Sequence, residues 1–149
     1  MDATTVERLE KSFNLLAPRG PELVDRFYAH LFSKNPQVRP LFPSNMNEQK
    51  QKLLASIQLV MANVRKPDAL LEPLTDMGRR HVYYGTQPAH YPVVRDTLIS
   101  VMRDMAGDAW NDDFQRAWTD ALNLIAGIMI EGHKAEQQSP KFKNLAATR

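Results

Sequence analysis

The chain has 149 residues, with 19 lysines and arginines against 17 aspartates and glutamates, so its formal net charge is +2. This length is typical of one domain, and the near balance of charge does not indicate nucleic acid as a partner. The absence of cysteine excludes disulfides, cysteine-based zinc sites, iron–sulfur clusters and thiol catalysis.

Proline and glycine divide the chain into segments whose apolar residues recur at helical spacing, which predicts an all-α protein. The first predicted helix begins with a capping box formed by Thr4 and Glu7. The second begins at Pro21 and ends at Asn35. Residues 36–42 then form a short proline-constrained corner, a turn or a 3₁₀ segment.

A third helix is expected to begin at residues 45–47 and to end before Pro67. Because Pro73 interrupts the next stretch, we expect a short turn before it and a helix over residues 74–84, closed by Gly85. The pattern of apolar residues in these segments indicates one buried face on each helix.

Two long helices complete the predicted set of six main helices plus a corner turn. The fifth follows residues 86–92 and ends at Gly107, and Asn111 caps the sixth. We expect residues 1–133 to form the domain and residues 134–149 to form a polar, partly disordered tail.

Neither membrane insertion nor secretion is indicated by the sequence. The longest apolar run, residues 124–130, falls well short of the roughly 18 residues that a membrane span needs. Residues 1–10 carry alternating charge and lack the apolar stretch of a secretory signal. We therefore expect a cytoplasmic protein with no membrane partner.

Of the four histidines, His81 lies on an apolar helix face with Leu70, Leu74 and Met77. Such a histidine is either a core residue bonded to a carbonyl or a ligand aimed into an apolar cavity. Zinc fits poorly, since no second histidine lies three to five residues away. A b-type haem needs a single axial imidazole from the protein, so His81 is a candidate haem ligand.

Four further residues have both a structural and a functional interpretation. Tyr28 lies on the apolar face of the second helix, where a core ring with a bonded hydroxyl is common. Gln49 and Leu53 share one face of the third helix, and Gln49 could equally be a surface residue. Phe42 in the corner could be ordinary core.

The order of these residues along the chain resembles the haem domain of flavohaemoglobins and the single-domain bacterial globins related to them. The resemblance covers roughly residues 5–133, and the full first helix favours the three-over-three globin fold over the two-over-two fold. The matching residues are, in chain order, Phe27-Tyr28, Asn35-Pro36, Phe42, Gln49 with Leu53, Gly78-Arg79-Arg80-His81 and Tyr91-Pro92-Val93-Val94.

This resemblance implies haem b (iron protoporphyrin IX) as the cofactor and His81 as its proximal ligand. Tyr28, Gln49 and Leu53 then form the distal pocket, in which Tyr28 and Gln49 stabilise the ligand. Lys52 could reach a haem propionate, although a free surface lysine is equally compatible with its position. The cofactor-binding residues implied are Phe42, which wedges the haem, and Lys52, Leu53, Met77, Arg80, Tyr91 and Val94.

Two features of the chain differ from the flavohaemoglobin group that it resembles, and both bear on activity. The proximal network of that group contains a glutamate in the last helix, but counting from Trp118 places His133 there, with Glu131 two residues earlier. The chain is also expected to contain no reductase, so redox turnover would need a separate reductase partner.

The resemblance leaves three functions open, with O₂, NO and CO as the small ligands. The first is tight, reversible O₂ binding for storage or transport. The second is an enzyme, a nitric oxide dioxygenase that works with a separate reductase. The third is a gas sensor, and a helical scaffold without haem remains a further alternative.

Overall fold

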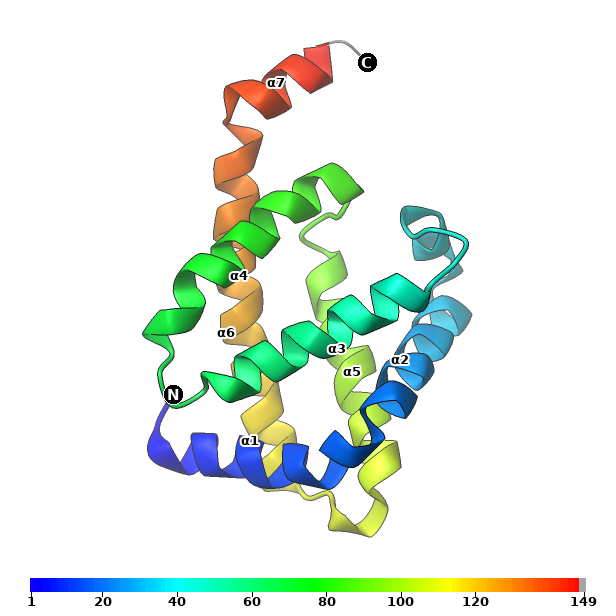
Figure 1. The fold of residues 1–149 in the computed structure, drawn as a ribbon, viewed down its shortest axis with the longest axis vertical. Coiled ribbons are helices and arrows are strands. Elements are labelled where there is room, and N and C mark those ends of the chain that lie inside the picture. The colour runs from blue at the N-terminus through cyan, green and yellow to red at the C-terminus, as the bar shows by residue number, and fades with distance from the viewer. Residues whose placement is uncertain (148–149) are drawn as a thin grey trace.

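A computed structural model describes residues 1–147, and within them every regular element is helical, with no strand (Figure 1). The α-helices are α1 (Ala3–Leu16), α2 (Gly20–Lys34), α3 (Asn47–Ala62), α4 (Asp68–His81), α5 (His90–Ala106), α6 (Asp112–Gln137) and α7 (Pro140–Ala147). Short 3₁₀ helices join them: η1 (Ala17–Arg19), η2 (Pro36–Leu41), η3 (Val82–Tyr84) and η4 (Gly107–Ala109). The predicted all-α class is confirmed, and η2 is the predicted corner.

Helix α1 begins differently from the prediction. Asp2, not Thr4, is the N-cap, and its Oδ1 accepts a hydrogen bond from the Thr5 amide at 2.8 Å. The predicted capping box of Thr4 and Glu7 is wrong because the helix starts at Ala3, which places Thr4 inside the first turn. An aspartate there also puts a negative charge at the positive end of the helix dipole.

Helix α4 corrects the predicted turn before Pro73 and the predicted helix over residues 74–84. It begins at Asp68, contains Pro73 and ends at His81, where η3 follows. Proline inside a helix costs about 3 kcal/mol, but Leu70 and Leu74 are both buried by this helix. Burial of each leucine contributes about 1.5–3 kcal/mol, which offsets the cost of the proline.

Helices α4 and α6 cross with their main chains in contact at two glycines. A Cβ at Gly78 of α4 would overlap the carbonyl of Met129 in α6, and a Cβ at Gly132 of α6 would overlap the carbonyl of Thr75 in α4. We call this reciprocal contact the glycine clasp. It fixes the position of α4 along α6, and His81 lies one turn beyond Gly78.

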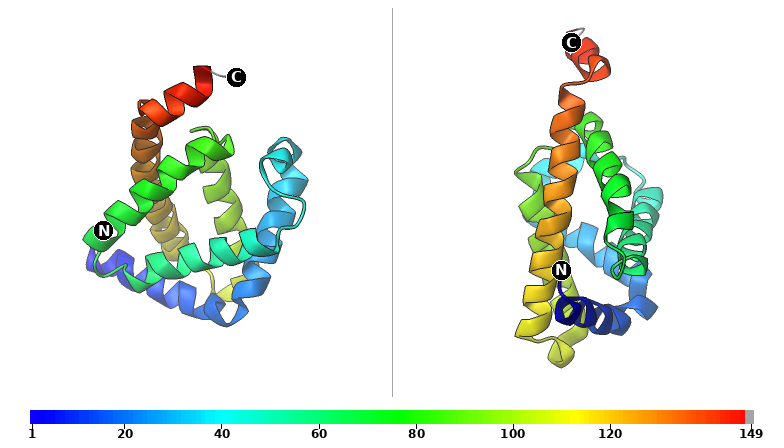
Figure 2. Two further views of the ribbon diagram at one scale, coloured as in Figure 1. Left: turned by 45° about the horizontal axis from the view of Figure 1, so that its top comes forward. Right: turned by 90° about the vertical axis from the view of Figure 1, so that its left-hand side faces the viewer.

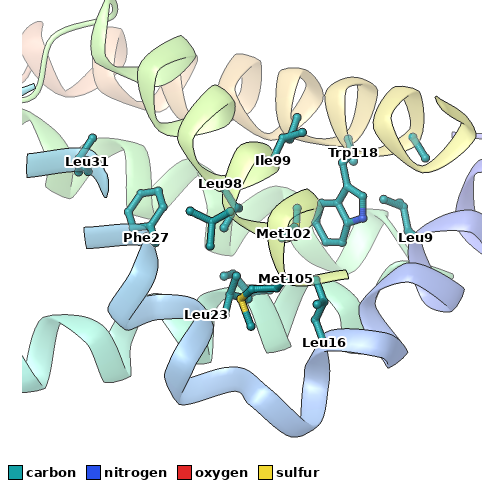
Figure 3. Close-up of a cluster of buried hydrophobic side chains, with 14 of the residues drawn as sticks. Leu9, Leu16, Leu23, Phe27, Leu31, Leu98, Ile99, Met102, Met105 and Trp118 are labelled. Atoms are coloured by element: carbon teal, nitrogen blue, oxygen red, sulfur yellow. The ribbon is translucent and has the colours of Figure 1, made fainter. Parts of the chain in front are cut away.

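The main hydrophobic core lies where α1, α2, α5 and α6 meet (Figure 3). Leu23 and Met102 are fully buried at its centre, and Phe27 lies beside them. The Trp118 indole Nε1 donates to Ser12 Oγ at 2.8 Å, which satisfies the polar atoms of both buried side chains. This core sets the angle between the long helix α6 and the transverse helix α1.

Helix α3 is packed incompletely by the rest of the described chain. It packs against α2 and makes no contact of similar extent with another element of the described chain. Ile57 is its buried residue, whereas Leu53, Leu54 and Met61 are half-buried. A second, smaller apolar cluster, formed by α4 and α6, lies apart from the main core. Val60 of α3 packs against this smaller cluster, and Leu53 and Met61 pack against the main core, so the described chain covers the inner face of α3 in part.

The predicted boundary at residue 133 falls inside α6, which continues to Gln137 and is followed by α7 (Figure 2). The Tyr83 hydroxyl donates to the Glu136 carboxylate, and the rings of Tyr83 and Phe142 lie 6.2 Å apart. Residues 134–147 are thus tied to η3. Residues 148–149 of the predicted tail lie outside the described residues, and its partial disorder stays a prediction.

None of the helices described within residues 1–147 combines the length and the apolar character needed to cross a membrane.

Candidate functional site

His81 is the last residue of α4, and its ring is held in a defined tautomer. Its Nδ1 lies 2.5 Å from the carbonyl oxygen of Met77, one turn earlier. Because a carbonyl can only accept, Nδ1 carries the hydrogen, and Nε2 keeps its lone pair. Burial lowers the pKa of His81, which favours the neutral ring. This neutral imidazole is the form that binds a metal.

The surroundings of His81 fit a haem. The ring of Tyr84 lies 5.3 Å from the His81 ring and that of Tyr91 lies 6.3 Å away. Met77 and Tyr91 pack against the smaller apolar cluster. Nε2 makes no hydrogen bond within the described chain, so one unpaired ligand atom stands in apolar surroundings. A porphyrin needs that donor set, since it supplies the other four nitrogens itself.

Tyr28 of α2 and Gln49 of α3 meet in a direct hydrogen bond. The Gln49 amide Nε2 donates to the Tyr28 hydroxyl oxygen at 3.0 Å. Burial raises the pKa of Tyr28, so the hydroxyl stays protonated at neutral pH. Since its oxygen already accepts from Gln49, the Tyr28 hydroxyl hydrogen is available for a third group.

An aromatic cluster fixes the orientation of the Tyr28 ring. The Phe42 ring lies 5.6 Å from Tyr28 and 5.3 Å from Phe32. Arg39 holds the corner, because its guanidinium donates to the carbonyls of Phe42 and Pro43 and lies 4.8 Å from the Phe32 ring centre. The corner therefore places Phe42 against Tyr28, and the predicted role of Phe42 as a cofactor-lining residue stays a prediction.

The remaining predicted residues lie at the edges of this region. Leu53 is half-buried, one helical turn after Gln49. Lys52 is exposed and pairs with Glu48 at 3.3 Å. Arg80 is exposed, and Val94 is 39% exposed. The contacts expected of Lys52, Arg80 and Val94 with a haem stay predictions.

The predicted residues thus form two groups. Tyr28, Phe42 and Gln49 contact one another on one side, and His81 groups with Met77 and Tyr91 on the other. In Figure 1 and in the left panel of Figure 2, the first turn of α3 and the last turn of α4 both lie toward the right-hand side of the molecule.

Sequence reasoning missed the state of two buried polar atoms beside this site. His133 is 2% exposed, and its Nδ1 has no hydrogen-bonding partner among the described residues. The Tyr91 hydroxyl is likewise buried without a partner. Sequence counting singled out the His133 position, but nothing in the sequence shows that the side chain is buried.

Comparison with known proteins identifies the family of the chain. The model of the globin family matches residues 25–129. Flavohemoprotein of Chromobacterium violaceum is 30% identical over 119 residues, which cover 78% of this chain and 30% of that protein. The chain therefore spans about a third or less of the length of the first flavohemoproteins that it matches.

Two further comparisons extend over nearly whole chains. An uncharacterized globin-like protein of Aquifex aeolicus is 26% identical over 136 residues, 91% of this chain and 96% of that one. The structure of a bacterial globin from Campylobacter jejuni superposes with a TM-score of 0.80 and 22% identity, covering 91% of this chain and 98% of that one. The chain therefore belongs to the globin family, whose fold implies a bound haem and a diatomic gas ligand.

Proposed function

We propose that this globin holds haem b through His81 and binds O₂ tightly and reversibly in a pocket formed by Tyr28, Gln49 and Leu53. The observation that carries the proposal is the hydrogen bond from Gln49 to Tyr28, which leaves the Tyr28 hydroxyl hydrogen free for a ligand. The haem supplies the iron that takes up the ligand. His81 presents Nε2 to it because Met77 holds Nδ1.

The distal residues determine how long the ligand stays. Tyr28 donates its hydroxyl hydrogen to the partly negative O₂, and Leu53 helps to keep water out. A hydrogen bond to a charged group contributes about 1.5–3 kcal/mol, which corresponds to roughly 10- to 100-fold in affinity. Slow release follows, and it suits storage or scavenging better than rapid delivery.

Replacement of Tyr28 with phenylalanine tests the distal part of the proposal. Tyr28→Phe keeps the ring and its contact with Phe42 but removes the donor, so O₂ dissociation should accelerate about 10- to 100-fold. Stopped-flow displacement of O₂ by CO measures the rate. Tyr83→Phe is the matched control, because the Tyr83 hydroxyl donates to Glu136 of α6, and it should leave the rate unchanged. Equal rates in wild type and Tyr28→Phe would contradict the proposal.

Replacement of His81 tests the axial ligand. His81→Ala should weaken haem retention, measured by the loss of the Soret band during transfer of haem to apomyoglobin. His90→Ala is the control, since His90 lies at the start of α5 and accepts a hydrogen bond from the Gln87 amide. Unchanged haem retention in His81→Ala would show that another residue holds the iron.

Nitric oxide dioxygenation with a separate reductase is the second candidate. A pocket with two donors that retains O₂ until NO arrives supports it, and so does the similarity to flavohemoproteins. In this reaction NO and O₂ combine to give nitrate, and the reductase supplies one electron per cycle. Continued NO consumption with reductase present supports the enzyme, whereas consumption of one equivalent per haem supports storage.

A further inference from the structure

Two buried polar atoms near His81 have no partner. They are the Tyr91 hydroxyl oxygen and His133 Nδ1. Polar groups in protein interiors are nearly always hydrogen-bonded, because an unsatisfied group costs about 1–3 kcal/mol. Each of these two atoms therefore needs a partner in the folded protein.

The glycine clasp places His133 on the side of α6 that faces α4. His133 directly follows Gly132, whose main chain touches Thr75 of α4. His133 also lies one helical turn after Met129, whose carbonyl meets Gly78 of α4. His133 therefore lies on the part of α6 that packs against α4, the helix that ends at His81.

Tyr91 approaches the same region from α5. Its ring lies 6.3 Å from the His81 ring at an interplanar angle of 33°. It also packs against the cluster that contains Met129, which precedes His133 by one turn of α6. The side chains of Tyr91 and His133 thus reach the His81 region from two helices.

The hydrogen-bonding capacities of the two side chains are complementary. A tyrosine hydroxyl has one hydrogen to donate, and a neutral imidazole has one nitrogen that accepts. If Nε2 of His133 carries its hydrogen, Nδ1 is the acceptor, and this is the atom that the structure leaves buried and unpaired. One bond between the two residues, direct or through one water, removes both unsatisfied atoms.

We propose that His133 is a positioning residue that accepts a hydrogen bond from Tyr91 and so holds the Tyr91 ring against His81. The proposal rests on His81 as the axial ligand. The arrangement places an imidazole, not a carboxylate, beside Tyr91. It leaves the Met77 carbonyl as the hydrogen-bond acceptor of His81 Nδ1.

Nitrogen NMR of the imidazole rings tests the hydrogen bond itself. In protein labelled with ¹⁵N at histidine, with ferrous haem and CO, His133 should show the Nε2–H tautomer with Nδ1 as acceptor. Tyr91→Phe should shift the His133 Nδ1 resonance, whereas Tyr84→Phe should not. The Nδ1–H tautomer, or a resonance that ignores Tyr91→Phe, would overturn the proposal.

The bond between iron and histidine tests the positioning role. His133→Leu and Tyr91→Phe should each shift or broaden the iron–histidine stretching band of the ferrous protein in resonance Raman spectra. The double variant should add nothing. His133→Asn should restore the band, because the asparagine side chain can place its acceptor oxygen near the position of Nδ1. An unchanged band in His133→Leu, or additive shifts in the double variant, would overturn the proposal.

Failure of the proposed function is distinguishable from failure of this inference. A wild-type protein that retains no haem through His81 contradicts the proposed function. The tautomer of His133 and its response to Tyr91→Phe can be measured in the same protein without haem, so they report on this pair alone.

Discussion

At the scale of single residues, the Gln49–Tyr28 pair shows how one hydrogen bond sets the direction of another. The Gln49 amide donates to the Tyr28 oxygen, which lowers the pKa of Tyr28, while burial raises it by more. The net effect is a protonated hydroxyl whose oxygen has one accepted bond and whose hydrogen remains to be donated.

Gln49→Leu should therefore raise the pKa of Tyr28 further, because the phenolate loses the amide that stabilises it. A pH titration of the Tyr28 ¹³Cζ resonance measures the change. Gln58→Leu on the exposed side of the same helix is the control and should leave the titration unchanged. A lower Tyr28 pKa in Gln49→Leu would show that the amide does not donate to the hydroxyl.

Helical periodicity predicted an apolar helix face for Tyr28 and for His81, whereas Phe42 and Gln49 were singled out only by the resemblance in the order of residues along the chain. Whether a side chain finds a partner depends on residues far away in the sequence. His133 illustrates this, since the clasp that buries it depends on residues more than 50 positions earlier. Lys52 is the opposite case. Its exposed ion pair with Glu48 joins residues four positions apart, and an isolated helix would form the same pair without any distant residue.

At the scale of elements, the glycine clasp predicts that alanine is destabilising at both of its glycines, and a third glycine on α6 provides the control. Gly78→Ala and Gly132→Ala each push a methyl group into a carbonyl of the neighbouring helix. Overpacking of this kind costs about 1–3 kcal/mol, and more where the backbone cannot move. Both variants should lower the free energy of unfolding in urea.

Gly127→Ala is the matched control on α6, because no atom lies within 4 Å of a Cβ at that position. Alanine is the better helix former by about 1 kcal/mol, so this variant should be as stable as the wild type or more stable. Stability that rises in all three variants would show that α4 and α6 are not in main-chain contact.

Element boundaries were predictable where local chemistry decides them and not where packing does. Asn111 accepts from the Phe114 amide and caps α6, and Gly107 ends α5 with a φ of 58°, as their residue types indicate. The prediction at Pro73 is wrong because the burial of Leu70 and Leu74 against α6 outweighs the local preference of proline. The gain from that burial depends on α6, which lies about 50 residues further along the chain.

At the scale of the whole molecule, the Tyr83–Glu136 bond joins η3 to the C-terminal part of α6. The hydrogen bond from Tyr83 lowers the pKa of Glu136 below its ordinary value of 4.5. A carboxyl group whose folded-state pKa is depressed stabilises the fold above its unfolded pKa. That contribution is lost as the pH falls through the folded pKa.

Glu136→Gln should therefore be less stable than the wild type at pH 7, and the difference should be smaller at pH 3. Thermal denaturation followed by circular dichroism at both pH values measures it. Glu131→Gln is the control, since Glu131 lies 3.9 Å from Lys134 on an exposed side of α6 and should show little effect at either pH. A difference that is undiminished at pH 3 would rule out the charged bond as its source.

The overall order of helices was predictable from the sequence, but the incomplete burial of the apolar face of α3 was not. Its apolar residues predict a buried face, and the chain itself covers that face incompletely. A helical pattern shows that a face must be covered without showing whether protein or a cofactor covers it.

The glycine clasp also limits how the molecule can move. A shift of either helix by one residue along the other would bring a β-carbon against a peptide carbonyl, so shear between α4 and α6 is blocked. In the proposed arrangement, in which His81 holds the haem, a displacement of its imidazole on ligand uptake would therefore involve a tilt of both helices as one body or a change in the Val82–Tyr84 turn.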